Sequence, residues 1–215
     1  MDYAKWITVT ASVVTPAGVV LLWLQFKRLQ KQVQADHERS RRELAVRLIQ
    51  HWSGAISPVT AAARRVVGSL DDTQCRDLEQ IKPFNTEVQL RPFLETCLAD
   101  ILAEDLLKIE GDRLQLTVKQ STRLRYLVAI YLNETEAVLL AWFLSIADRQ
   151  IIEQEFSPLY DERGGHDFLA KFRKAAGNEA FPAIDKFIEH LRKSRNAGRP
   201  DVRPQLPSGS AAGRA

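Results

Sequence analysis

A long uncharged stretch near the N-terminus constrains this chain more than any other feature of its sequence. No charged residue occurs from Trp6 to Phe26, which is 21 of the 215 residues. As an α-helix, this stretch would be about 32 Å long, enough to cross a bilayer hydrocarbon core of about 30 Å. Lys27, Arg28 and Lys31 follow at once, as they do where translocation across a membrane stops. The sequence therefore predicts a transmembrane anchor over residues 1–26 and a basic juxtamembrane cluster after it.

Three alternatives to a spanning helix stay open at this point. A cleaved signal peptide is disfavoured because the apolar stretch is too long and no small-residue cleavage pattern follows it. A buried helix of a soluble protein would seldom lie uncharged at the extreme N-terminus, where ordering is poor. In the third alternative, Thr15 caps a helix that begins at Pro16. Only about 16 Å of apolar helix would then remain, and it would lie in the membrane surface.

Five residues characterise the predicted anchor. Trp6 and Trp23 lie near its two ends, where interfacial aromatic residues are enriched, and Leu22 belongs to its most apolar part. Pro16 and Gly18 interrupt the stretch, which membrane helices tolerate.

Small residues also recur within the anchor. Ala11, Thr15 and Gly18 are four and three residues apart, so they would share one helix face. Such a face lets membrane helices approach one another closely, although small residues are equally expected in a weakly apolar span.

The distribution of cations predicts the orientation of the anchor. Lys5 stands beside Asp2 on one side, whereas a cluster of Lys and Arg follows on the other. Because cations concentrate in cytoplasmic loops, the C-terminal domain is predicted to be cytoplasmic in a single-pass topology. Cys75 and Cys97 have no metal or redox spacing, and we expect both to be reduced thiols in that compartment.

Three segments are expected after the anchor. Residues 27–53 lack Gly and Pro, are rich in Lys and Arg, and are predicted to form a basic helical stalk. Its cations would either contact anionic lipid or form a solvated face. Residues 54–193 are predicted to form an all-α cytoplasmic domain. Residues 194–215, poor in apolar side chains, are predicted to form a disordered basic tail.

The domain contains several helix signals. Ser57 and Pro58 are typical of a helix start, and the helix should end at Gly68. Asp71 or Asp72 would cap the next helix. Residues 114–118 alternate as a strand would, but no partner strand is visible in the sequence, so we expect an extended connector or the first turn of the following segment. The predicted fold class is all-α: a single N-terminal transmembrane helix, a helical stalk and an irregular helical bundle.

The centre of the domain is predicted over residues 121–156. Apolar residues occur on nearly every helix face there, which is typical of a buried helix. A second membrane span is disfavoured because Glu134 and Glu136 would lie at its middle, at a cost of about 2.5–3.5 kcal/mol each. We therefore expect the central helix of a bundle, with a new helix starting at Asp148.

Chemical motifs are few. The chain has no phosphate loop, dinucleotide fingerprint, nucleophile elbow or zinc signature, so we assign no catalytic residue, metal or cofactor. His166 and Asp167 resemble a metal pair but lack further ligands, and one of them is expected to cap the next helix. Asn133 and Glu136 are three apart on the central helix. They form either a ligand-binding pocket or an internal hydrogen bond between helices.

The run YLVAIYLNETEAVLLAWFLSIADRQIIEQEFSPLY, residues 126–160, resembles the central segment of an uncharacterised family of bacterial and phage proteins, a domain of unknown function. Asn133, Glu136 and Asp148 occupy the matching positions, and residues 6–193 fit the family in outline. The resemblance implies an N-terminal membrane helix, a basic stalk and a helical cytoplasmic domain at the bacterial inner membrane. It implies no activity.

From these features we expect a membrane-anchored, non-enzymatic interaction or regulatory module that can self-associate. Its partners would be the lipid bilayer and either a second copy or another protein. A net charge of only +3 gives no reason to expect specific nucleic-acid binding. Two alternatives stay open. One is an oligomerising membrane effector, for example in phage defence; the other is an enzyme or ligand-binding domain with a buried Asn133/Glu136 pocket.

Overall fold

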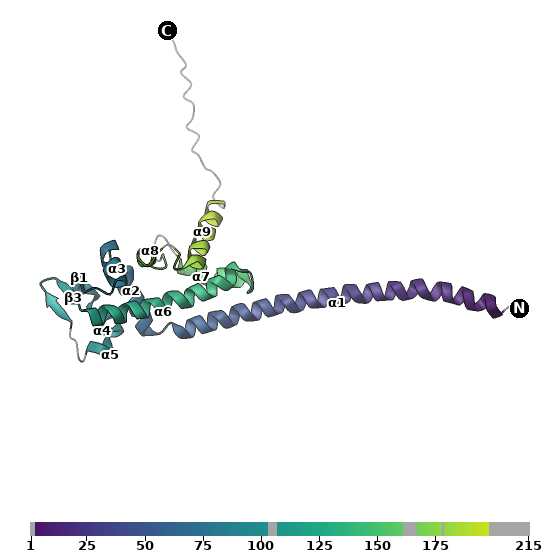
Figure 1. Ribbon diagram of the computed structural model, residues 1–215, viewed down its shortest axis with the longest axis horizontal. Helices are drawn as coiled ribbons and strands as arrows, with labels where there is room; N and C mark the ends of the chain where they lie inside the picture. Colours follow the sequence, from purple (N-terminus) through teal and green to yellow (C-terminus); the bar gives the residue numbers. More distant parts are fainter. Residues whose placement is uncertain (1–2, 103–106, 161–166, 178, 198–215) are drawn as a thin grey trace, which may run out of the picture.

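A single long helix projects from a domain built of shorter helices (Figure 1). The computed structural model describes the backbone of residues 3–102, 107–160, 167–177 and 179–197. Helix α1, Tyr3–Ala55, has 53 residues and runs through Pro16 and Gly18 without a break. At 1.5 Å per residue it is about 80 Å long. Because α1 begins at Tyr3, the alternative of a helix that starts at Pro16 is wrong.

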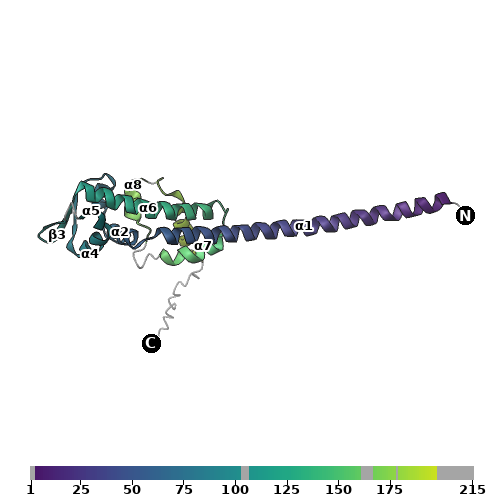
Figure 2. The same ribbon diagram turned by 90° about the horizontal axis from the view of Figure 1, so that it is seen from below.

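The C-terminal part of α1 belongs to the domain. Ala45 is fully buried, and Leu44, Leu48 and Trp52 pack against the core. This part lies beside α6 and α7 in both views (Figures 1 and 2). The backbone N–H of Asp148 donates to the carbonyl of Arg41 at 3.1 Å. The helix therefore joins the core well before residue 54, where the sequence placed the start of the domain.

Two short helices follow and begin as the sequence predicts. Helix α2 is Pro58–Gly68, and the Ser57 hydroxyl accepts from the amide of Thr60. Helix α3 is Asp72–Glu79, and Asp71 caps it in a reciprocal arrangement with Gln74. Such caps satisfy first-turn amides that have no partner within the helix.

A three-stranded antiparallel sheet corrects the all-α prediction. Strands β1 (Phe84–Glu87), β2 (Lys108–Glu110) and β3 (Arg113–Leu116) lie in the order β1-β3-β2. Residues 114–116, expected to be a connector, therefore form the central strand. Phe84 pairs with Leu116 and Thr86 with Leu114, and all four side chains are buried. The sheet forms because a partner lies on each side of β3 and one face covers the core.

From the end of β1 to residue 102 the chain is mainly helical. A 3₁₀ turn at Val88–Leu90 leads into α4, Arg91–Cys97, and α5 is Ala99–Leu102. Helix α4 packs against α2, and its Leu94 and Cys97 are fully buried.

The central helix of the domain is α6, Val118–Phe143, which contacts α1, α2, α3, α7 and α9. Among the residues whose side chains the structure describes, which begin at residue 21, it is the one helix long and apolar enough to cross a membrane, and half of its most apolar stretch is buried within the domain. Its position agrees with the prediction of a central bundle helix. Asp148 then caps α7, Arg149–Phe156, as expected, and a 3₁₀ turn follows at Ser157–Leu159.

Two C-terminal helices close the domain, α8 (Ala170–Ala176) and α9 (Pro182–Ala197). Leu169, and not His166 or Asp167, is the N-cap residue of α8, but Asp167 accepts from the first amide of the helix, that of Ala170, at 3.1 Å. His166 lies outside the described residues. The predicted tail begins within α9, and its residues 198–215 also lie outside them.

Candidate functional site

The projecting segment of α1, residues 21–40, is exposed along its whole length. Its first residues are large and apolar, which is unusual for a surface in water. The exposed apolar side chains of the segment are Leu21, Leu22, Trp23, Leu24, Phe26, Leu29 and Val33. Such a surface requires a lipid or protein environment to cover it.

The basic cluster of Lys27, Arg28 and Lys31 begins directly after the most apolar part of this surface. The Lys27 ammonium lies 4.0 Å from the centre of the Trp23 ring, close enough for a cation–π interaction. Arg28 and Lys31 are exposed. For Trp6, Pro16 and Gly18 the structure describes a helical backbone; their side chains lie outside its description.

The two candidate ligand-binding residues have different surroundings. Asn133 is exposed, whereas Glu136 is half-buried. The two carboxylate oxygens of Glu136 accept from the backbone amides of Ala183 and Ile184 at 2.7 and 2.9 Å. These amides belong to the first turn of α9, where a negative charge is favourable. Glu136 therefore joins α6 to α9, and the two side chains are not buried together.

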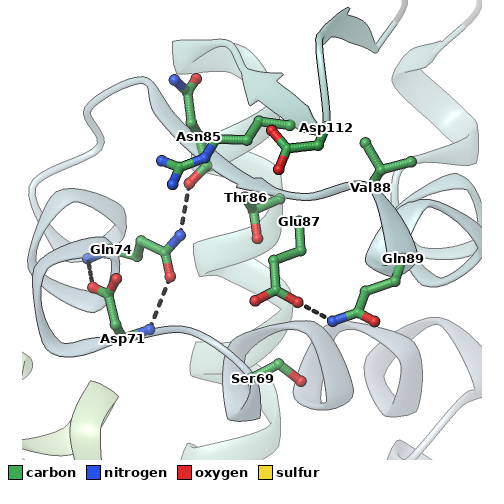
Figure 3. Close-up of a pocket in the computed structure, with 10 residues that line it drawn as sticks. Ser69, Asp71, Gln74, Asn85, Thr86, Glu87, Val88, Gln89 and Asp112 are labelled. Carbon is green, nitrogen blue, oxygen red and sulfur yellow. Dashed lines mark hydrogen bonds between the residues drawn. The ribbon is translucent and has the colours of Figure 1, made fainter.

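A polar cleft of about 490 Å³ lies between the α2–α3 connection and β1. Figure 3 shows the side chains of Asp71, Gln74, Thr86 and Glu87 lining it. Gln74 bridges the two walls: its amide nitrogen donates to the carbonyl of Asn85 at 2.7 Å, and its amide oxygen accepts from the Asp71 backbone at 2.8 Å.

The polar groups of this cleft mostly bind one another. The Asp71 carboxylate accepts from the amides of Thr73 and Gln74 at 2.8 Å, and Gln89 donates to Glu87. No group of three or more His, Cys, Asp or Glu side chains among the described residues is arranged to hold a metal ion. The cleft offers hydrogen-bonding groups to a polar ligand, but no arrangement of nucleophile and base.

A cluster around Trp142 was not foreseen from the sequence. The indole N–H of Trp142 donates to Glu153 at 2.7 Å, and the Arg149 guanidinium lies 4.4 Å from the centre of its ring. His190 of α9 lies 3.3 Å from the same Glu153 oxygen. The cluster joins α6, α7 and α9. The spacing of Arg149 and Glu153, four residues apart in one helix, was its available signal.

Both cysteines are free and fully buried. Burial raises the pKa of the Cys75 thiol to about 11 and that of the Cys97 thiol to about 12, because a thiolate is poorly solvated in the core. Neither thiol is suited to nucleophilic chemistry.

Comparisons with known proteins leave the site to be judged on its geometry, since no family model, no curated protein and no solved structure matches the chain.

Proposed function

We propose that this chain is a membrane-anchored, non-enzymatic interaction module. Residues 6–26 cross the bacterial inner membrane once, residues 27–40 of the projecting segment lead away from it, and the domain lies in the cytoplasm.

The observation that carries this proposal is the exposure of consecutive large apolar side chains on α1. Leu21, Leu22, Trp23 and Leu24 are between 45% and 66% exposed, and Phe26 is 57% exposed. They end the uncharged stretch of α1 that begins at Trp6. A bilayer would remove this surface from water, which is favourable by about 25 cal/mol per Å² of apolar area.

Two further features support the orientation. Lys27, Arg28 and Lys31 follow the apolar stretch directly, and cations of this kind stay on the cytoplasmic side. The free, buried Cys75 and Cys97 are compatible with a reducing compartment.

An interaction role for the domain agrees with the observation that its candidate polar side chains form hydrogen bonds within the protein. Glu136, the most suitable candidate for buried chemistry, holds the first turn of α9. Asp71 and Gln74 likewise join α3 to β1. The resemblance of residues 126–160 to a membrane-associated family of unknown function supports the same proposal.

Membrane fractionation of the full chain tests the anchor. After expression in bacteria, the protein should stay in the pellet through an alkaline carbonate wash. Added protease should degrade the domain in disrupted cells and leave it intact in spheroplasts. Release by the wash, or degradation in intact spheroplasts, would contradict the anchor or its orientation respectively.

A pair of substitutions makes this test specific. Val14→Arg places a cation near the middle of the stretch, at a cost of about 2.5–3.5 kcal/mol for insertion, and should move most of the protein out of the membrane pellet. Gln25→Arg adds the same charge at the end of the stretch, where the side chain reaches the headgroups, and should leave the distribution unchanged. If both variants stay in the pellet alike, the stretch does not span.

A further inference from the structure

We propose that α1 is also a parallel self-association surface, on which Leu22, Phe26, Leu29 and Val33 pack against the same residues of a second copy of this chain. These four residues are the α1 stripe. The inference rests on the proposed function, because a common membrane holds the two helices in the same orientation.

The α1 stripe has the spacing of a helix–helix contact. Its residues are four, three and four apart, so they lie on one face of the helix. All four are exposed, from 47% at Val33 to 66% at Leu22. On the cytoplasmic side the stripe ends at Asp36, which occupies its next position.

Charge around the stripe favours a second copy over other occupants. At about 100° per residue, the positions beside the stripe are taken by neutral glutamines, while the cations lie on the opposite face. The glutamines are Gln25, Gln30 and Gln32, and the cations are Lys27, Arg28 and Lys31. From Leu22 to Val33, two identical helices can therefore meet stripe to stripe without placing like charges together, which would otherwise oppose the contact. At the next position two Asp36 carboxylates would meet, so the contact is expected to end at Val33.

The domain leaves this face free. Ala45, Leu48 and Trp52 contact the core, and their average direction is about a quarter turn from that of the stripe. Two copies can thus bring their stripes together with the domains at the sides. Residues 34–40 of the projecting segment separate the stripe from the domain along the helix axis, and Figure 2 shows α1 projecting away from the domain.

The stripe alone covers less than two heptads, too short for a coiled coil in water. Two circumstances of the anchored chain compensate for this. Confinement to a membrane raises the effective concentration of the second copy. In the sequence, the small residues Ala11, Thr15 and Gly18 continue the same helical face into the anchor, as in membrane helix pairs that pack closely.

Disulfide cross-linking of the full chain in bacterial membranes tests this proposal. Val33→Cys places a thiol in the stripe, and Lys31→Cys places one at nearly the same depth on the opposite face. For helix axes 8–10 Å apart and a Cα radius of about 2.3 Å, paired Cα atoms would be about 5 Å apart at position 33 and about 14 Å apart at position 31. A disulfide requires less than about 7 Å.

We expect mild oxidation to convert Val33→Cys to a disulfide dimer at least about ten times more efficiently than Lys31→Cys. Leu29→Cys should behave as Val33→Cys does, since a parallel pair brings both positions together. The unmodified chain should give no dimer because both native thiols are buried.

A carbonate wash of the same membranes separates the two proposals. Retention in the pellet with equal cross-linking at positions 31 and 33 overturns self-association and leaves the anchor intact. In that case, protection of Val33→Cys from a water-soluble thiol reagent would identify lipid as the occupant of the stripe. Release by the wash with selective cross-linking at position 33 overturns the anchor alone, and release without cross-linking overturns both.

Discussion

Two parts of helix α1 share their secondary structure but differ in the exposure and packing of their side chains. In the projecting segment, residues 21–40, every side chain is exposed. From residue 44 onward, successive turns of the same helix place Ala45, Leu48 and Trp52 against the core. Residues 19–53 contain no Gly or Pro, which lets one helix cover both parts. Helix formation and tertiary packing are therefore separate properties of the sequence, and only the second distinguishes the parts.

The two tryptophans of α1 give the largest expected difference between its parts. Trp52 packs 4.9 Å from the Phe156 ring centre and donates to Thr135 at 3.1 Å, so Trp52→Ala should lower the free energy of unfolding of the domain by about 2–4 kcal/mol. Trp23→Ala, in the projecting segment, should change it by less than about 0.5 kcal/mol. Chemical denaturation in detergent, followed by circular dichroism, measures both. Equal effects would contradict the separation of the two parts.

Thiol reactivity contrasts the core of the domain, which holds both native cysteines, with the projecting segment. The raised pKa values of Cys75 and Cys97, about 11 and 12, leave almost no thiolate at about pH 8. In the folded chain both should react with a thiol reagent at least about a hundred times more slowly than the thiol of Lys31→Cys. Denaturant should abolish the difference, which makes the unfolded protein its own control.

The raised thiol pKa values also predict that the domain becomes less stable as the pH rises into the alkaline range. A folded-state pKa above the unfolded one means that the folded state holds the proton more tightly. The contribution of the two thiols to the free energy of unfolding is therefore complete below about pH 9 and is lost progressively as the pH rises toward 11–12. The Cys75→Ala variant should lose less stability than the wild type over that alkaline range, and a parallel decline in both would argue against the assignment.

The smallest expected difference in unfolding free energy is between variants of two carboxylates, Glu136 in the domain and Glu38 on the projecting segment. Glu136→Gln removes one of the two acceptors at the first turn of α9 and the favourable charge there, so unfolding should become easier by about 1–2 kcal/mol. Glu38→Gln, on the exposed projecting segment, should have an effect of less than about 0.5 kcal/mol. Calorimetric or denaturant unfolding of the two variants side by side decides the matter. An unchanged Glu136→Gln would remove the structural role of this residue and reopen the ligand-binding alternative.

Local sequence signals predicted the helical part of the fold well. Ser57 caps α2, Asp71, one of two candidates, caps α3, and a helix starts at Asp148 as expected, because a cap depends only on residues within one turn. The central position of α6 followed from apolar residues on nearly every face. These features require no knowledge of distant parts of the chain.

Long-range contacts explain what the sequence did not reveal. Strands β1 and β2 have four and three residues, too few to show alternation, and β3 is a strand only because both lie beside it. For Glu136 the sequence left two roles open, a ligand-binding pocket with Asn133 or an internal hydrogen bond between helices. Its partners are backbone amides 47 and 48 residues away, which a side-chain pattern cannot indicate.

The continuity of α1 from Tyr3 to Ala55 makes it a spacer of fixed length and phase. From Phe26 to Arg41, where the domain begins to touch it, the helix rises about 22 Å, so the domain is held at a set height above the end of the apolar stretch. Each residue added to the projecting segment would raise the domain by about 1.5 Å and turn it by about 100° around the helix axis. The distance of the domain from the apolar stretch and its rotation about the helix axis therefore change together.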